Sequence, residues 1–289
     1  MNPTARVMRE AYRRELLPAR LRWYLAADGM ADWYRSVARG LGPALGDDAK
    51  PTLSALGSQM LARRWLVLRE RHPHLAMASE RDGALVMSGL YRVRAADKTR
   101  WIFDTVGGPP RGVRETLRQR RLLFPIGAEA RWREVTAHLG ELLIVLTEEL
   151  PKKVPHARKL LGDVCFAMGE RFAAHVKKTF DMGSPPDAPA AAIEVLRMSE
   201  YVFRVNPEHW HGSDAAQNTG FLEGNACPWY DRPGWNGGHC GIFGQFQSGI
   251  SSAFGLRYHL AQTIPKHGGT TCRVDLKPIS ISKKPVTVV

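Results

Sequence analysis

The chain has 289 residues, 44% of them hydrophobic and 24% charged, which is enough apolar material for a core and excludes wholesale disorder. Its 41 Lys and Arg against 28 Asp and Glu give a net charge of +13, carried mostly by scattered arginines before residue 185, which favours a solvated basic surface over nucleic-acid binding. No apolar run is long enough to span a bilayer, and no apolar signal core follows Met1. We therefore expect a cytoplasmic protein without a membrane partner.

Apolar residues at three- and four-residue spacing predict helices through the first part of the chain. The predicted helices cover residues 5–40, 51–71, 112–122, 129–149 and 154–180. Residues 74–79 and 84–94 look like strands, and the turn-forming pair Asp82-Gly83 between them predicts a small hairpin. Residues 101–105 are a candidate third strand.

The Pro-rich stretch 182–190 is the clearest change of composition and predicts a domain boundary. We expect a helix-rich domain with a small β-hairpin at 1–185 and an α+β domain at 186–289. The elements predicted in the second domain are an extended segment at 193–205, a loop-rich region at 206–238, a helix at 240–254 and a hairpin of strands at 258–264 and 272–276. The predicted fold class is α+β, with a C-terminal antiparallel sheet packed on helices.

Residues 201–258 hold 11 of the 25 aromatic residues of the chain, although this region is also rich in glycine. So much apolar surface in a loop-rich segment indicates an aromatic pocket for a small molecule. The alternative is a loop-rich core packed by tryptophan. Five residues of this region are the substrate-binding candidates: Trp210, Trp229, Trp235, His211 and Arg257.

Cys240 follows a pair of glycines and begins a predicted helix. The helix dipole and the free backbone N–H groups at such a position lower the pKa of a thiol and favour the nucleophilic thiolate. We predict that Cys240 is the catalytic nucleophile and that His239 or His209 moves the proton, with His211 and Asp231 as other partners. The alternative is a small buried cysteine at the start of a packed helix.

The four cysteines form no CxxC pair and no signal peptide precedes them, so we expect free thiols. His209 and His211 have a spacing that suits a metal, but together with the cysteines they match no closed zinc signature. We therefore expect no metal and no cofactor, and keep a zinc- or iron-dependent enzyme as an alternative. Cys165 and Cys272 are predicted core residues.

Four sequence features of the C-terminal third resemble the L-2-amino-thiazoline-4-carboxylic acid hydrolase family, which is similar in turn to 4-vinyl reductase-type ligand-binding domains. They are Tyr201-Val-Phe-Arg-Val, Cys227-Pro-Trp, the pair His239-Cys240 at the start of a helix, and the segment Gly268-Gly269-Thr-Thr-Cys272-Arg-Val-Asp-Leu. Sensor members hold zinc with cysteines and a glutamate. Cys240 and Cys272 match the first and last of these ligands, but residues 259–267 contain neither Glu nor Cys.

The resemblance implies hydrolysis of a C–N bond in a small cyclic anionic substrate, and it adds Cys227 to the catalytic candidates. The predicted function is therefore a C–N hydrolase of small-molecule metabolism with a cysteine-centred site. The alternative from another class is a small-molecule binding or sensor module with an aromatic pocket. The oligomeric state is not predicted by any of these patterns.

Overall fold

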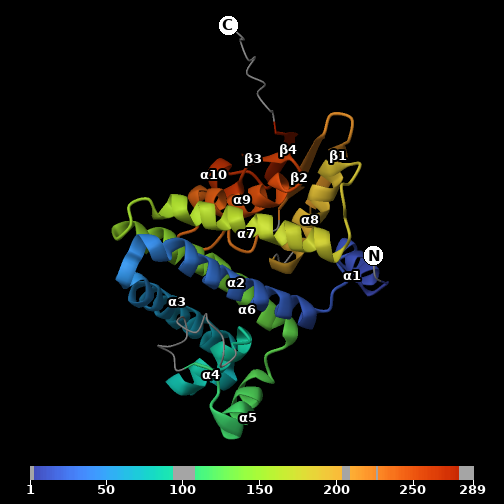
Figure 1. Cartoon of the computed structure of the whole chain (residues 1–289). Coiled ribbons are helices and arrows are strands. Elements are labelled where there is room, and N and C mark those ends of the chain that lie inside the picture. Colours follow the sequence, from blue (N-terminus) through green and yellow to red (C-terminus); the bar gives the residue numbers. More distant parts are fainter. Residues whose placement is uncertain (1–2, 94–107, 204–208, 226, 280–289) are drawn as a thin grey trace.

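The computed structural model describes residues 3–93, 108–203, 209–225 and 227–279 (Figure 1). The helices before the sheet are α1 (Pro3–Arg13), α2 (Ala19–Leu45), α3 (Ala49–Arg71), α4 (Glu80–Leu90), α5 (Gly112–Leu123), α6 (Ala128–Glu149), α7 (Ala157–Thr179) and α8 (Ala188–Phe203). The predicted strand at 101–105 lies outside the described residues. The predicted helices are otherwise present, except that residues 5–40 form two helices, because Glu15 has a φ of 57° and Pro18 precedes α2.

The C-terminal part contains a four-stranded antiparallel sheet in the order β1-β2-β4-β3. Its elements are β1 (His209–Asp214), β2 (Thr219–Gly224), α9 (Gly237–Ser252), β3 (Leu256–Gln262), the short helix α10 (Ile264–His267) and β4 (Cys272–Pro278). The protein is therefore α+β, as predicted, and β3 and β4 form the predicted hairpin. Figure 1 shows α9 and α8 next to the sheet, with α7 beside α9 and the α2 and α6 helices beyond it.

Two glycines allow α7 and α9 to pack at backbone contact. A Cβ built on Gly169 would lie 1.9 Å from the Phe246 carbonyl oxygen, and one on Gly249 would lie 2.1 Å from the Phe166 carbonyl oxygen. No larger residue fits at either position without moving the helices apart. The buried apolar residues of both predicted domains belong to one cluster, whereas the division at residue 185 itself stays a prediction.

The predicted hairpin at 74–94 is wrong, because the structure forms a helix there. Ser79 caps α4, with its side chain accepting a hydrogen bond from the Asp82 backbone N–H while the Asp82 carboxylate accepts one from the Ser79 N–H. Asp82 is therefore part of a capping box and not of a turn. Gly83 is accommodated within α4 because Trp65 fills the place of its missing side chain.

Two further expectations for the C-terminal part are corrected. Residues 193–203 are the end of α8 and not an extended segment, and their buried side chains follow a helical period. Part of the predicted loop region 206–238 forms β1 and β2, which pair with each other and place β2 against β4. Among the described helices, none is long and apolar enough to cross a membrane.

Candidate functional site

The first turn of α9 carries both His239 and Cys240, and the two side chains leave the helix on different sides. The turn is capped by Asn236, whose side-chain oxygen accepts a hydrogen bond from the Gly238 N–H at 2.9 Å. Successive side chains on a helix are separated by about 100°. Although they are neighbours in sequence, His239 and Cys240 therefore face two different cavities.

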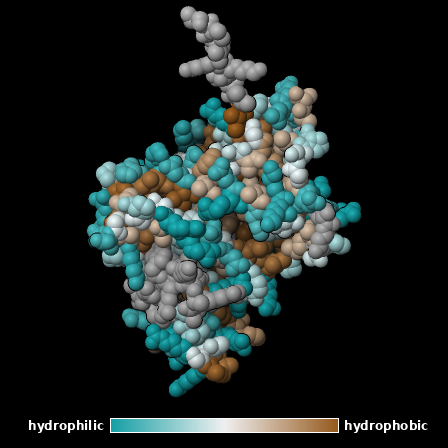
Figure 2. Space-filling model, in the orientation of Figure 1, coloured by the Kyte–Doolittle hydropathy of each residue, from teal (hydrophilic) through white to brown (hydrophobic). Residues whose placement is uncertain are grey.

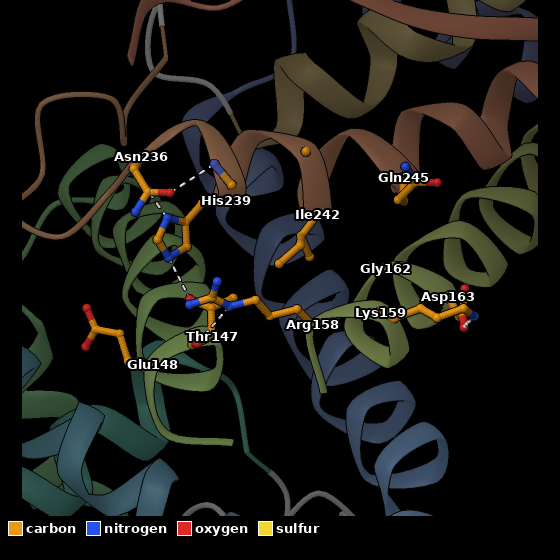
Figure 3. A pocket seen from close by; sticks show the side chains of 12 residues that line it. Thr147, Glu148, Arg158, Lys159, Gly162, Asp163, Asn236, His239, Ile242 and Gln245 are labelled. Atoms are coloured by element: carbon orange, nitrogen blue, oxygen red, sulfur yellow. Dashed lines mark hydrogen bonds and ion pairs between the residues drawn. The ribbon is translucent and has the colours of Figure 1, made fainter. Parts of the chain in front are cut away.

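His239 faces a surface hollow of about 510 Å³ between α9, the end of α6 and the start of α7 (Figure 3). Its Nδ1 accepts the Asn236 backbone N–H at 3.1 Å, so Nε2 carries the proton and donates to the Thr147 hydroxyl at 2.6 Å. Burial lowers the pKa of His239, consistent with the neutral ring. Both ring nitrogens are thus hydrogen-bonded: Nδ1 within the capped first turn of α9, and Nε2 to Thr147 of α6.

Cys240 faces a second cavity of about 60 Å³ on the sheet side of α9. The lining residues are Glu200, Leu222, Gly224, Cys227, Trp229, Trp235, Cys240, Phe243, Gln247, Tyr258, Leu260, Thr263, Cys272 and Val274. At about 30 Å³ of liquid for each water, this space holds roughly two waters, and the cavity is partly open to solvent. We call it the thiol cavity, because it brings three cysteines together from a loop, a helix and a strand.

The Cys240 thiol is not activated in the protein without a ligand, because its pKa is raised. Burial raises its pKa to about 11; a hydrogen bond from Trp235 lowers it, and the nearby Cys227 and Cys272 raise it further. The predicted lowering of this pKa by the helix terminus is therefore wrong, because burial next to aromatic side chains outweighs the dipole. Cys240 is a neutral thiol at pH 7 until a substrate or a base draws off its proton.

Two indoles form the aromatic wall of the thiol cavity. Trp235 Nε1 donates to Cys240 Sγ at 3.3 Å, and Trp229 Nε1 donates to the Thr136 carbonyl oxygen of α6 at 2.8 Å. The two rings lie 5.4 Å apart. Trp229 and Trp235 both line the thiol cavity, and the Thr136 carbonyl of α6 fixes the place of Trp229.

A row of polar side chains on the opposite part of the lining was missed by sequence reasoning. Gln247 donates to Glu200 at 2.8 Å, and its carbonyl oxygen accepts a short hydrogen bond from the Tyr258 hydroxyl. The Thr263 hydroxyl is buried and has no hydrogen-bond partner among the described residues. A buried polar atom without a partner costs free energy, so this hydroxyl is suited to a polar group of a ligand.

No local sequence signal marks these polar residues. Glu200 and Gln247 belong to the helices α8 and α9, whereas Tyr258 and Thr263 come from β3 and the residue after it. Only the packing of α8 and α9 on the sheet brings them to one cavity.

The remaining candidates lie outside the lining of the thiol cavity. Trp210 is 60% exposed on β1, and Arg257 is exposed on β3. His209 Nε2 lies 4.0 Å from a carboxylate oxygen of Glu15, and the exposed His211 lies 3.5 Å from an Arg197 nitrogen. Burial, followed by the charge of Arg197, lowers the pKa of His211. The structure therefore separates these four residues from the three thiols.

Cys165 and Cys272 are the two cysteines predicted to lie in the core. Cys165 is fully buried in α7, as predicted, and burial raises its pKa. Cys272 is not the predicted core residue: it is half-buried in the cavity wall, where its Sγ accepts the Ile264 backbone N–H at 3.3 Å. Within the part of the chain that the structure describes, no three His, Cys, Asp or Glu side chains are arranged to hold a metal ion.

Comparison with known proteins gives no assignment for the chain. No family model matches it, and neither a curated protein nor a solved structure does. The geometry of the thiol cavity is therefore the basis for any statement about function.

Proposed function

We propose that the protein is a hydrolase that opens a C–N bond of a small cyclic substrate in the thiol cavity, with Cys240 as the nucleophile. The observation that carries this proposal is that Cys240, Glu200 and Thr263, whose hydroxyl is unpartnered among the described residues, line one cavity. These are the three groups that such a reaction needs: a nucleophile, a proton acceptor and a donor to a polar atom of the substrate.

In the proposed reaction, Cys240 Sγ forms a bond to the ring carbon while its proton passes toward Glu200. The C–N bond then breaks while Glu200 returns the proton to the leaving nitrogen. Water next attacks the sulfur-bound carbon and gives its proton to Glu200, the C–S bond breaks, and the Cys240 thiolate takes that proton back. Glu200 replaces His239 and His209 as the proton carrier, because neither histidine lines the cavity. Among the described lining residues there is no lysine or arginine, which favours a neutral substrate over the anionic one that the resemblance implies.

The raised pKa of Cys240 fits a proton transfer that is coupled to attack. A neutral thiol is a weak nucleophile, so the base has to act during the reaction and not before it. The indoles of Trp229 and Trp235, 3% and 8% exposed, keep bulk water from the site.

The experiment compares ring opening of 2-aminothiazoline and of its 4-carboxylate by mass spectrometry. We expect turnover to fall at least about a thousandfold in Cys240→Ala and at least about tenfold in Glu200→Gln, because one removes the nucleophile and the other the base. Cys165→Ala is the matched control, since it removes a thiol that lies outside the cavity. Full turnover by Cys240→Ala on either compound contradicts the proposal.

A binding module is the second candidate, and the neutral state of Cys240 favours it. A cavity with aromatic walls and polar groups can hold a small ring without reacting with it. Saturable binding of either compound without product, unchanged in Glu200→Gln, would support this candidate over the hydrolase.

A further inference from the structure

The helix α5 has one face against the protein and one face in solvent, and the two faces differ in chemistry. On the inner face, Glu115 accepts from the Arg81 guanidinium at 3.0 Å, and Arg118 donates to Asp82 at 2.8 Å. Gln119 donates to the Leu85 carbonyl oxygen at 2.8 Å, and Leu123 fills the space next to Gly89. These contacts fix the rotation of α5 on α4.

The outer face carries three large apolar side chains. Val113 is 76% exposed, Leu117 58% and Phe124 85%. Phe124 follows the last residue of α5 but keeps helical backbone angles, so at 100° per residue the three side chains lie within about 40° of one another. Three such side chains on one line form an apolar ridge, unlike the single exposed apolar residues that are normal on protein surfaces.

Cations flank this ridge and anions are excluded from it. Arg114, Arg120 and Arg121 are exposed, and within the described residues no ion pair is recorded for any of them. Glu115 is the only acidic residue between 111 and 124, and it points inward. The outer face therefore combines an apolar ridge with unneutralised positive charge, which is typical of a helix that lies on an anionic membrane surface.

The position of α5 suits a membrane better than a protein partner. In the shared orientation of Figures 1 and 2, α5 lies at the lower tip of the molecule, where apolar surface is visible among polar residues. A convex tip can insert a few side chains between lipid headgroups, whereas a stable protein interface needs about 800 Å² on each partner. Met77 is 97% exposed and lies near this tip: it follows His74 closely in sequence, and the His74 ring is hydrogen-bonded to the Leu122 carbonyl oxygen of α5.

We propose that the outer face of α5, defined by Val113, Leu117 and Phe124 with Arg114, Arg120 and Arg121, docks the protein on the anionic headgroups of a lipid bilayer. The apolar ridge enters the headgroup region and the arginines bind the lipid phosphates or carboxylates. Such contact needs no spanning helix, so it revises the sequence expectation of no membrane partner, which rested on the lack of a spanning run. The thiol cavity is not involved, and the docking is independent of the proposed hydrolase.

The test is flotation of the full chain with vesicles of phosphatidylcholine alone and of phosphatidylcholine with 30% phosphatidylglycerol. We expect partitioning onto the anionic vesicles only, and weaker partitioning at high salt. Arg120→Glu with Arg121→Glu should weaken it at least about tenfold, since each arginine near such a surface contributes several-fold to binding. The control is Lys50→Glu with Lys178→Glu, on α3 and α7, which changes the net charge by the same amount away from α5. This variant should reduce partitioning far less.

A second set of variants tests insertion separately from charge. The serine triple variant Val113→Ser, Leu117→Ser, Phe124→Ser should no longer be retained on anionic vesicles. The control is Val7→Ser with Leu16→Ser, because these apolar residues are similarly exposed but lie on α1 and just after it. The control should keep its retention. Brominated lipid should quench the tryptophan fluorescence of Phe124→Trp more than that of the wild-type chain. Equal binding to neutral vesicles, equal loss in both lysine and arginine variants, or full binding by the serine triple variant would each overturn the proposal.

Discussion

Two clusters of titratable side chains in the described part of the chain differ in their surroundings. In the helical part, Arg64, Glu134, His138 and Tyr34 are each 3% exposed or less. The Glu134 carboxylate accepts from Arg64 and, at 2.8 Å, from Arg71, while the Tyr34 hydroxyl forms a short hydrogen bond with His138 Nε2. In the thiol cavity, by contrast, the reactive groups border a space of about 60 Å³.

This difference shows why perturbed pKa values alone do not locate a site. Burial lowers the pKa of His138 and raises that of Tyr34, just as it raises the pKa of Cys240. In the helical cluster these shifts accompany close packing, with Tyr91 4.4 Å from the His138 ring. A substrate needs space as well as chemistry, and the thiol cavity provides both, so it is the candidate site. His138 Nδ1 and Arg64 Nε are also unpartnered among the described residues, but neither residue lines the thiol cavity.

The largest expected effect tests the structural role of the helical cluster. Glu134→Gln should lower the free energy of unfolding by about 3–5 kcal/mol, because it leaves the buried Arg64 without a counter-charge. The control is Glu129→Gln on the same helix, whose pair with Arg133 at 2.7 Å is exposed, and its cost should stay below about 0.5 kcal/mol. Urea denaturation measures both. Equal effects of the two changes would contradict a structural role for the buried Arg64–Glu134 pair.

A smaller effect concerns His138 and pH. Its pKa in the folded protein lies well below 6.5, mainly through burial and then through the charge of Arg64. The unfolded chain binds more protons as pH falls below 6.5, so the neutral ring stabilises the fold above that pH and the stabilisation is lost below it. Between pH 7.5 and 5.5 the wild type should lose about 1 kcal/mol more than His138→Gln. Parallel pH profiles from urea denaturation would contradict this.

The smallest expected effect sharpens the description of the thiol cavity. Trp235→Phe removes the N–H bond to Cys240 Sγ, so the pKa of the thiol should rise above about 11 and its alkylation by iodoacetamide at pH 9 should slow a few-fold. Trp229→Phe opens similar space but leaves that bond in place, and it is the matched control. Mass spectrometry of the Cys240 peptide gives the rates. If both variants react alike, the indole hydrogen bond has no part in setting the state of the thiol.

Local patterns predicted the elements whose partners lie nearby in sequence. The apolar spacing located α3, α6 and α7, and the alternation in residues 258–276 located the β3–β4 hairpin. Misassigned segments had patterns compatible with two structures. Asp82-Gly83 is typical of a turn, but Ser79 makes Asp82 part of a helix cap. Tyr201 and Phe203 alternate as in a strand, but Val195, Ser199 and Val202 bury one helical face.

The sequence by itself determined the α+β class, the aromatic and cysteine enrichment of the C-terminal third, and Cys240 at the start of a helix. The tertiary structure alone decided that Cys227, Cys240 and Cys272 share a cavity, and that Glu200 and Thr263 line it too. It also decided that His239 turns away to Thr147. The reason is that helix and strand periods are set by neighbours along the chain, whereas a cavity is set by segments that meet only after α8 and α9 pack on the sheet.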